Sequence, residues 1–235
     1  MRRHVWSWVA VVGAFLRFGT AAAEAGSEPF ELSFGGGAVV GQPLGDFADQ
    51  VGTPYGLGGH LAWARPGHAW GLRIEAAGLI YGSETKHVPV GREGLRQSVE
   101  VETTNGMATL GVGPQLVTPR GSVRPYITGF AGFSYFSTES RVRPDGSFVT
   151  TAFSTNYDDT VFAYGGGVGI LIPLSGSPTS GGLALDLGAR FLGGGKVRYL
   201  AEGDLQDAPG GSVTFTPRQT KANRIEFHVG LTGLP

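Results

Sequence analysis

Charged and histidine side chains recur inside segments that are otherwise apolar, and these are the residues whose types could do chemistry. A charge that is buried alone is prohibitively costly. Opposite charges in such segments are therefore expected to pair with one another and to have a structural role. An ion path and catalysis are the alternatives that clustered titratable groups leave open. The charged residues are Glu31, Arg73, Glu75, Asp186, Arg190, Arg224 and Glu226, with His60 and His228 nearby.

The spacing of these residues does not mark a catalytic, cofactor or metal site. Ser33 and Ser134 are expected on the same faces as the charges, but no spacing identifies a Ser-His-acid triad with His228. The glycine-rich stretch Gly35 to Gly41 lacks the Gly-Lys-Ser/Thr ending of a phosphate-binding loop. The absence of cysteine excludes thiolate metal sites. We expect no enzymatic activity, no cofactor and no metal.

The composition excludes some classes of protein. A formal net charge of -1 gives no electrostatic footprint for binding nucleic acid. Without cysteine there is no disulfide framework. The 41 glycines among 235 residues lie mostly inside apolar segments and show neither a collagen repeat nor a linker pattern. Small residues in such number suit the narrow interior of a small barrel.

The first residues have the pattern of a removable signal peptide. Arg2-Arg3 supplies a positive start, Val5 to Phe18 is largely apolar, and Ala21 to Ala23 supplies the small residues of a cleavage site. The apolar stretch is short for spanning a bilayer as a helix. We therefore expect a signal peptide at residues 1–23 and one barrel domain at 24–235.

After the signal peptide, apolar and polar residues alternate with period two, which is the pattern of strands with two different faces. In Leu183 to Phe191, the leucines take one face while Asp186 and Arg190 take the other. No later window is apolar and long enough for a membrane helix. The alternating segments are Phe30 to Val40, Tyr55 to Ala64, Trp70 to Tyr81, Gly106 to Val117, Arg124 to Phe136, Thr160 to Ile172, Leu183 to Phe191 and Arg224 to Thr232.

The connections between these segments alternate in length, which is the asymmetry of bacterial outer-membrane barrels with short periplasmic turns and longer extracellular loops. The short connections, such as Arg65-Pro66-Gly67, carry turn residues. An even strand number places both termini in the periplasm. We therefore predict an all-β fold, an eight-stranded antiparallel up-and-down transmembrane β-barrel. The long connections are Gln42 to Pro54, Gly82 to Asn105, Ser137 to Asp159 and Ala201 to Ala222. The residues Lys196 to Leu200 and Ser98 to Thr103 suggest that some of these connections begin as strand extensions above the membrane.

Three glycine- and aromatic-rich segments, Tyr126 to Tyr135, Gly111 to Leu116 and Tyr164 to Gly169, resemble the small outer-membrane β-barrel family, the OmpA/OmpX-like eight-stranded barrels. The resemblance covers essentially the whole mature chain and implies a fold with function open. It also implies insertion by the barrel assembly machinery, although the chain ends on Pro235 rather than on the usual aromatic residue.

Together these patterns predict a noncatalytic, multi-pass protein of the bacterial outer membrane with a role in envelope integrity or surface interaction. The expected partners are outer-membrane lipid, lipopolysaccharide and the barrel assembly machinery. Nucleic acid is not expected as a partner, and the composition of the surface loops does not identify a ligand. A porin-like channel for small solutes, a lipid-modifying enzyme that uses His228, and an exported soluble barrel with its leucines inward are the alternatives. Aromatic residues expected at the lipid interfaces are Trp63, Trp70, Tyr81, Phe136, Tyr164 and Tyr199.

Overall fold

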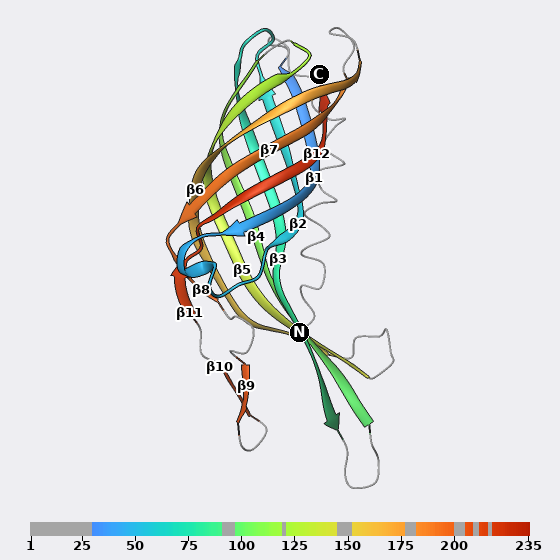
Figure 1. Ribbon diagram of the computed structural model, residues 1–235, viewed down its shortest axis with the longest axis vertical. Helices are drawn as coiled ribbons and strands as arrows, with labels where there is room; N and C mark the ends of the chain where they lie inside the picture. Colours follow the sequence, from blue (N-terminus) through green and yellow to red (C-terminus); the bar gives the residue numbers. More distant parts are fainter. Residues whose placement is uncertain are drawn as a thin grey trace.

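Eight strands close into a single barrel, in the order β1-β12-β7-β6-β5-β4-β3-β2 (Figure 1). The computed structural model describes residues 30–90, 97–118, 121–144, 152–176, 182–199, 205–208, 212–215 and 218–235, so the predicted signal peptide lies outside the described residues. Each strand pairs antiparallel with its neighbours, which confirms the all-β, eight-stranded up-and-down fold. The barrel strands are β1 (Glu31–Pro43), β2 (Tyr55–Ala64), β3 (Trp70–Val90), β4 (Gln97–Val117), β5 (Arg124–Pro144), β6 (Ala152–Gly176), β7 (Gly182–Gly194) and β12 (Arg224–Leu234).

Four strands are longer than the alternation predicts. β3 to β6 have 21, 21, 21 and 25 residues, against 13, 10, 13 and 11 in β1, β2, β7 and β12. The strand extension expected at Ser98 to Thr103 is confirmed as part of β4. Most of Gly82 to Asn105 and Ser137 to Asp159 is strand rather than loop, because the β3–β4 ladder continues to Val90 opposite Gln97 and the β5–β6 ladder to Val142 opposite Ala152. These extensions lie beyond the other strands at the bottom of Figure 1.

The remaining elements lie in two of the long connections. A 3-10 helix, η2 (Gly45–Phe47), lies between β1 and β2. Between β7 and β12, β8 (Lys196–Tyr199) lies where a strand extension was expected, and it pairs with β11 (Arg218–Lys221). Within the predicted loop Ala201 to Ala222, β9 (Leu205–Ala208) pairs with β10 (Ser212–Phe215). No helix among the described residues is long and apolar enough to cross a membrane.

The short connections that the structure describes lie at the end of the barrel that carries the C-terminus, at the top of Figure 1. Between β2 and β3, Pro66 is followed by Gly67 with φ 75°, a left-handed conformation that favours glycine. The N–H of His68 donates to the carbonyl of Arg65 at 3.0 Å and closes the turn. The turn chemistry predicted for this connection is thus present.

The two faces of the barrel have opposite chemistry. Leu183 is 38% exposed on the outside, whereas Asp186 on the same strand is 2% exposed and points inward. This direction does not support the alternative of a soluble barrel with its leucine rows inside. Large apolar side chains are exposed on every barrel strand, and they include Phe34, Val40, Tyr55, Leu57, Trp70, Leu72, Ile80, Leu110, Val112, Leu116, Ile127, Phe133, Phe162, Tyr164, Val168, Leu174, Leu183, Phe191, Phe227, Val229 and Leu231.

An apolar cluster fills the lumen at the end where β3 to β6 extend. Phe47 of η2 is fully buried there, with its ring centroid 6.3 Å from that of Phe136 in an edge-on contact. The placement of Tyr81 and Phe136 at a lipid interface is wrong, because both side chains turn into this cluster, whereas Trp70 and Tyr164 are exposed as predicted. The connection between β1 and β2 therefore folds back into the barrel. The cluster consists of Val39, Phe47, Leu79, Tyr81, Met107, Phe136, Val197 and Ala222, with Val51 and Val161 packed against it.

Replacing Phe47 with alanine should destabilise the barrel by about 3–5 kcal/mol, because it removes a fully buried ring and leaves a cavity among Tyr81 and Phe136. Phe47→Met keeps the cavity filled and should cost less than about 1.5 kcal/mol. Chemical unfolding of the purified barrel in detergent micelles measures both. Equal stabilities of the alanine variant and the wild type would show that η2 does not close the lumen.

Candidate functional site

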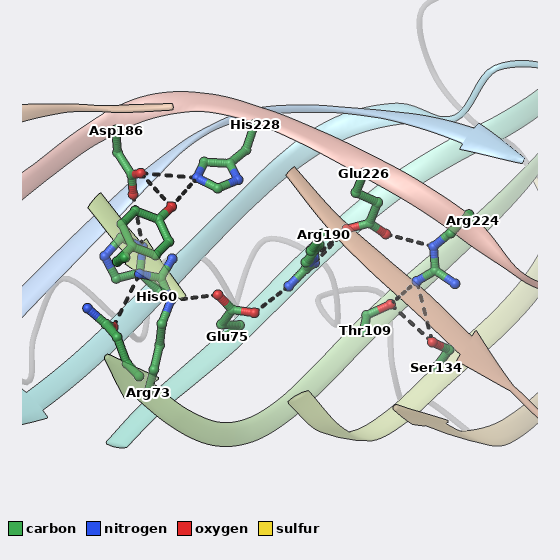
Figure 2. Close-up of polar contacts among 12 residues, drawn as sticks. His60, Arg73, Glu75, Thr109, Ser134, Asp186, Arg190, Arg224, Glu226 and His228 are labelled. Carbon is green, nitrogen blue, oxygen red and sulfur yellow. Dashed lines mark hydrogen bonds and ion pairs between the residues drawn. The ribbon is translucent and has the colours of Figure 1, made fainter. Parts of the chain in front are cut away.

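Five charged side chains of alternating sign cross the lumen, and we call Arg73, Glu75, Arg190, Glu226 and Arg224 the charge chain (Figure 2). Arg190 is its centre: Nη1 donates to Glu75 Oε2 at 2.7 Å, and Nη2 donates to Glu226 Oε2 at 2.6 Å. Each carboxylate also binds a second guanidinium. Arg73 Nε lies 2.5 Å from Glu75 Oε1, and Arg224 Nε lies 2.7 Å from Glu226 Oε1.

The strand arrangement explains why these residues meet. Glu226 and Arg190 are directly paired on neighbouring strands β12 and β7. Glu75 comes from β3, which lies opposite β7 in the order of the closed sheet, so its contact with Arg190 spans the lumen. In an eight-stranded barrel the interior is only wide enough for side chains to fill. Long side chains from opposite walls therefore reach each other directly.

The three guanidinium groups of the charge chain also contact polar or aromatic neighbours. Arg224 Nη2 donates to Thr109 Oγ1 at 2.7 Å, and its guanidinium extends toward Ser134 (Figure 2). The guanidinium of Arg73 lies 5.3 Å from the ring centroid of Tyr126, and that of Arg190 lies 5.6 Å from the ring of Phe130. Each guanidinium thus has a carboxylate partner and a second favourable contact.

Asp186 belongs to a second group, the histidine cluster, which we define as His60, Tyr126, Asp186, His228 and Thr232. The Tyr126 hydroxyl donates to Asp186 Oδ1 at 2.8 Å, and His228 Nε2 lies 3.1 Å from the same oxygen. The Thr232 hydroxyl donates to Asp186 Oδ2 at 3.2 Å. A buried carboxylate that accepts several hydrogen bonds is stabilised by them, so the cluster holds Asp186 without a guanidinium.

Glycine makes room for the rings of this cluster. A side chain at Gly188 would overlap the His228 ring and would place its Cβ 2.8 Å from the Tyr126 hydroxyl. At Gly169 a Cβ would overlap Tyr126 from the neighbouring strand. The high glycine content therefore has a specific use here: small residues on β6 and β7 lie where bulky lumen side chains need space.

The inward residues of β7 show that the lumen is filled in layers. Ala184 belongs to an apolar cluster with Tyr126 and Leu171 near the short turns. Asp186 and Arg190 follow in the histidine cluster and the charge chain, and Leu192 packs with Phe130 and Ala163. A cavity of about 40 Å³ remains between the two polar groups, bordered by Gly37 and Gly58. This leaves room for roughly three water molecules.

Of the seven charged residues singled out in the sequence, the structure brings five together in the charge chain. Asp186 is buried but contacts the histidine cluster rather than the charge chain. Glu31 does not join either group: it faces inward by alternation, but as the first residue of β1 it is exposed at the rim of the barrel.

Sequence reasoning missed several partners of these groups. Tyr126 and Thr232 occupy inward positions on β5 and β12, and Thr109 and Gln115 do so on β4. All four are buried, and Gln115 accepts a hydrogen bond from Arg73 at 3.5 Å. The period-two alternation places Thr109, Gln115 and Thr232 on the inner face, as the sequence predicts. Their contacts depend on which strands meet across the lumen, which alternation does not reveal.

The lumen hydroxyls contact carboxylates, guanidinium groups and one another. Among the described residues, no group of three or more His, Cys, Asp or Glu side chains could hold a metal ion. Ser134 contacts Thr109 and Arg224 rather than a histidine. The Thr232 hydroxyl lies 3.5 Å from His60 Nε2 but donates its hydrogen bond to Asp186 Oδ2, so its proton points to the carboxylate rather than to the histidine.

Among known proteins, only solved structures resemble this chain. No protein-family profile matches the chain, and no curated protein matches it. Ail, the attachment invasion locus protein of Yersinia pestis, solved with the heparin analogue sucrose octasulfate, is 11% identical over 87% of this chain and 96% of its own, with a TM-score of 0.40. Neisserial surface protein A is 13% identical over 90% and 99%, with a TM-score of 0.37. A major outer membrane protein from Thermus thermophilus is 13% identical over 88% and 99%, with a TM-score of 0.38.

Replacing Arg190 with methionine should destabilise the barrel by about 3–5 kcal/mol, because it leaves the carboxylates of Glu75 and Glu226 buried without their shared partner. Neutralising all three, with Glu75→Gln and Glu226→Gln added, should cost less than Arg190→Met alone. Equilibrium unfolding in micelles measures the losses. The control is Lys86→Met, which breaks an exposed ion pair with Glu84 and should cost about 0–1 kcal/mol. Strictly additive losses across the three positions would count against coupling in the charge chain.

Proposed function

We propose that the protein is an integral β-barrel of the bacterial outer membrane, noncatalytic and closed to solutes, with a role in envelope integrity or surface interaction. The observation that supports this most is the outward face of the barrel, where every strand exposes large apolar side chains. Soluble proteins rarely expose a contiguous apolar patch of this kind. An apolar surface that surrounds the whole barrel is most stable in contact with lipid.

The height of the apolar surface agrees with this proposal. On β6 the outward residues run from Phe162 to Leu174, both more than half exposed. At about 3.3 Å per residue and a strand tilt of about 40°, this run spans roughly 30 Å along the barrel axis. The hydrocarbon core of a bilayer is about 30 Å thick. Trp70 and Tyr164, toward opposite ends of this belt, have the amphipathic rings that favour lipid interfaces.

The filled lumen favours a structural role over a solute channel. The apolar cluster around Phe47 closes one end, and the cluster of Tyr126, Leu171 and Ala184 narrows the other. Between them Arg190 joins the two glutamates across the lumen. A hydrated ion would have to separate these pairs, and breaking a buried ion pair is strongly unfavourable.

The surroundings of the lumen hydroxyls support the noncatalytic part of the proposal. Ser33 donates to the carbonyl of Ala62, and Ser134 lies beside Thr109 and Arg224. His228, the residue that a lipid-modifying enzyme would need as a base, contacts Asp186 and Tyr126 instead. No described serine is thus placed to be activated by either lumen histidine.

The apolar belt, the short turns and the strand extensions would each contact different partners. Outer-membrane lipid and lipopolysaccharide would surround the apolar belt, and the barrel assembly machinery would insert the chain. The short turns would lie in the periplasm, and the extensions of β3 to β6 would project from the cell. Such long surface strands and their connections are the part of the protein available to another cell or molecule.

Fluorescence quenching tests the membrane location. The mature chain has two tryptophans, Trp63 and Trp70, and both are replaced by phenylalanine. A single tryptophan is then introduced by Leu110→Trp on the outward face of β4, or by Thr53→Trp in an exposed connection as a control. In vesicles of phosphatidylcholine brominated on its acyl chains, the first should lose most of its emission and the second little. If brominated lipid reduced the emission of both tryptophans by the same fraction, an apolar belt in contact with lipid would be excluded.

Planar-bilayer recordings test closure of the lumen. The wild-type barrel should show no regular single-channel openings, because side chains fill its cross-section at several levels. A variant with both Phe47→Ala and Arg190→Ala should show them. Well-defined openings of the wild type that are lost in Arg73→Ala or Arg190→Ala would instead support a small-solute channel with the charge chain as its selective element.

A further inference from the structure

An exposed cationic face lies on the small ladder of β8 and β11, outside both lumen groups. Lys196 of β8 is directly opposite Lys221 of β11, and Arg198 is opposite Gln219. All four side chains are exposed, whereas Val197 and Thr220 between them are buried. Val197 belongs to the apolar cluster around Phe47, so the register of the ladder forces its cations outward.

This arrangement is unfavourable unless an anion compensates it. Directly opposed residues of an antiparallel pair have Cβ atoms only about 4.5–5.5 Å apart, and like charges at such positions are destabilising. Among the described residues, no carboxylate forms an ion pair with Lys196, Arg198 or Lys221. Other exposed cations at the same end are paired, Lys86 with Glu84 at 3.3 Å and Arg141 with Glu139 at 3.8 Å.

The carboxylate of Asp159 accepts two backbone N–H groups beside this face. Asp159 Oδ2 accepts the N–H of Arg198 at 2.8 Å, and Asp159 Oδ1 accepts the N–H of Thr160 at 2.8 Å. These bonds attach β8 to β6 and hold the ladder in place. They leave the ammonium and guanidinium groups of the exposed face without a described protein partner.

The position of this face matches that of lipid headgroups. Inward residues Ala222 and Arg224 alternate with outward Lys221 and Ile225, so Lys221 faces the same way as the apolar belt. Lys221 lies four residues beyond Ile225, which corresponds to at most roughly 10 Å along the barrel axis. The headgroup region of one leaflet extends roughly 5–8 Å beyond the hydrocarbon. The long side chain of a lysine reaches back into it.

The geometry points to a binding site for the phosphate groups of lipopolysaccharide on the outward face of β8 and β11, formed by Lys196, Arg198 and Lys221. Phosphate accepts bonds from several cations at once, and arginine matches its geometry with two parallel N–H donors. The phosphorylated sugar of this lipid lies at the height of the ladder and faces it. This site rests on the proposed location in the outer membrane, and it would fasten the end of the β7–β12 connection to the leaflet.

The test compares wild-type barrel with a variant carrying Lys196→Gln, Arg198→Gln and Lys221→Gln, and with a control carrying Lys86→Gln and Arg141→Gln. Each folded barrel, in zwitterionic micelles, is titrated with bis-phosphorylated lipid A, with lipid A lacking both phosphates, and with inorganic pyrophosphate, and complexes are counted by native mass spectrometry. The unheated electrophoretic mobility of each variant checks folding. The replaced side chains are exposed, so all variants should fold.

We expect the triple variant to bind bis-phosphorylated lipid A at least about tenfold more weakly, the factor that loss of one charge-assisted hydrogen bond produces. The control should bind like the wild type, and added salt should weaken wild-type binding. Unchanged affinity of the triple variant overturns the site. Equal affinity of the wild type for pyrophosphate and lipid A overturns the headgroup as ligand in favour of free polyphosphate. Failure of the outer-membrane proposal is detected separately, by the quenching measurement at Leu110→Trp.

Discussion

Closure of the sheet is the constraint on which the other features of this protein depend. β1 pairs with β2 on one side and with β12 on the other, so the backbone groups of the barrel bond to each other around a complete ring. With the backbone satisfied internally, the outer face is free to be apolar on every strand. The same closure fixes a narrow interior, because eight strands enclose little more than the volume of their own inward side chains.

That narrow interior accounts for the polar contents of the lumen. Charges placed on opposite walls are within reach of each other, and the low dielectric that makes a lone charge costly strengthens the paired ones. Arg190 therefore joins Glu75 and Glu226 from different strands, while Asp186 is held by Tyr126 and the histidines. Glycine at positions such as Gly188 admits the bulky partners, and apolar clusters fill the space toward each end.

The extended strands show what alternation measures. In the barrel it follows the contrast between the apolar outer face and the polar inner face, and there it identified all eight strands. In residues 82–90 and 137–144 this contrast ends, yet β3 and β5 continue, because neighbouring strands still offer backbone partners. The cationic ladder of β8 and β11 is a related case. Each of its strands is only four residues long; the sequence indicated β8 as a strand extension after Gly195, but its pairing with β11 depends on the tertiary structure.

The sequence by itself determined the number of barrel strands, the face that most barrel residues occupy and the presence of opposite charges on the inner face, because period two is a local property of an extended chain. Only the tertiary structure decided which charges meet. Whether an inward residue lies in the lumen or at its rim depends on how the strands are staggered when the sheet closes. This stagger leaves Glu31 exposed at the rim, and it places Asp186 beside His228 while Arg73 pairs with Glu75. The burial of Phe47 within the barrel was likewise decided by packing: a connecting segment carries no periodicity, and its apolar side chain finds its partners only once several distant segments have assembled around the lumen.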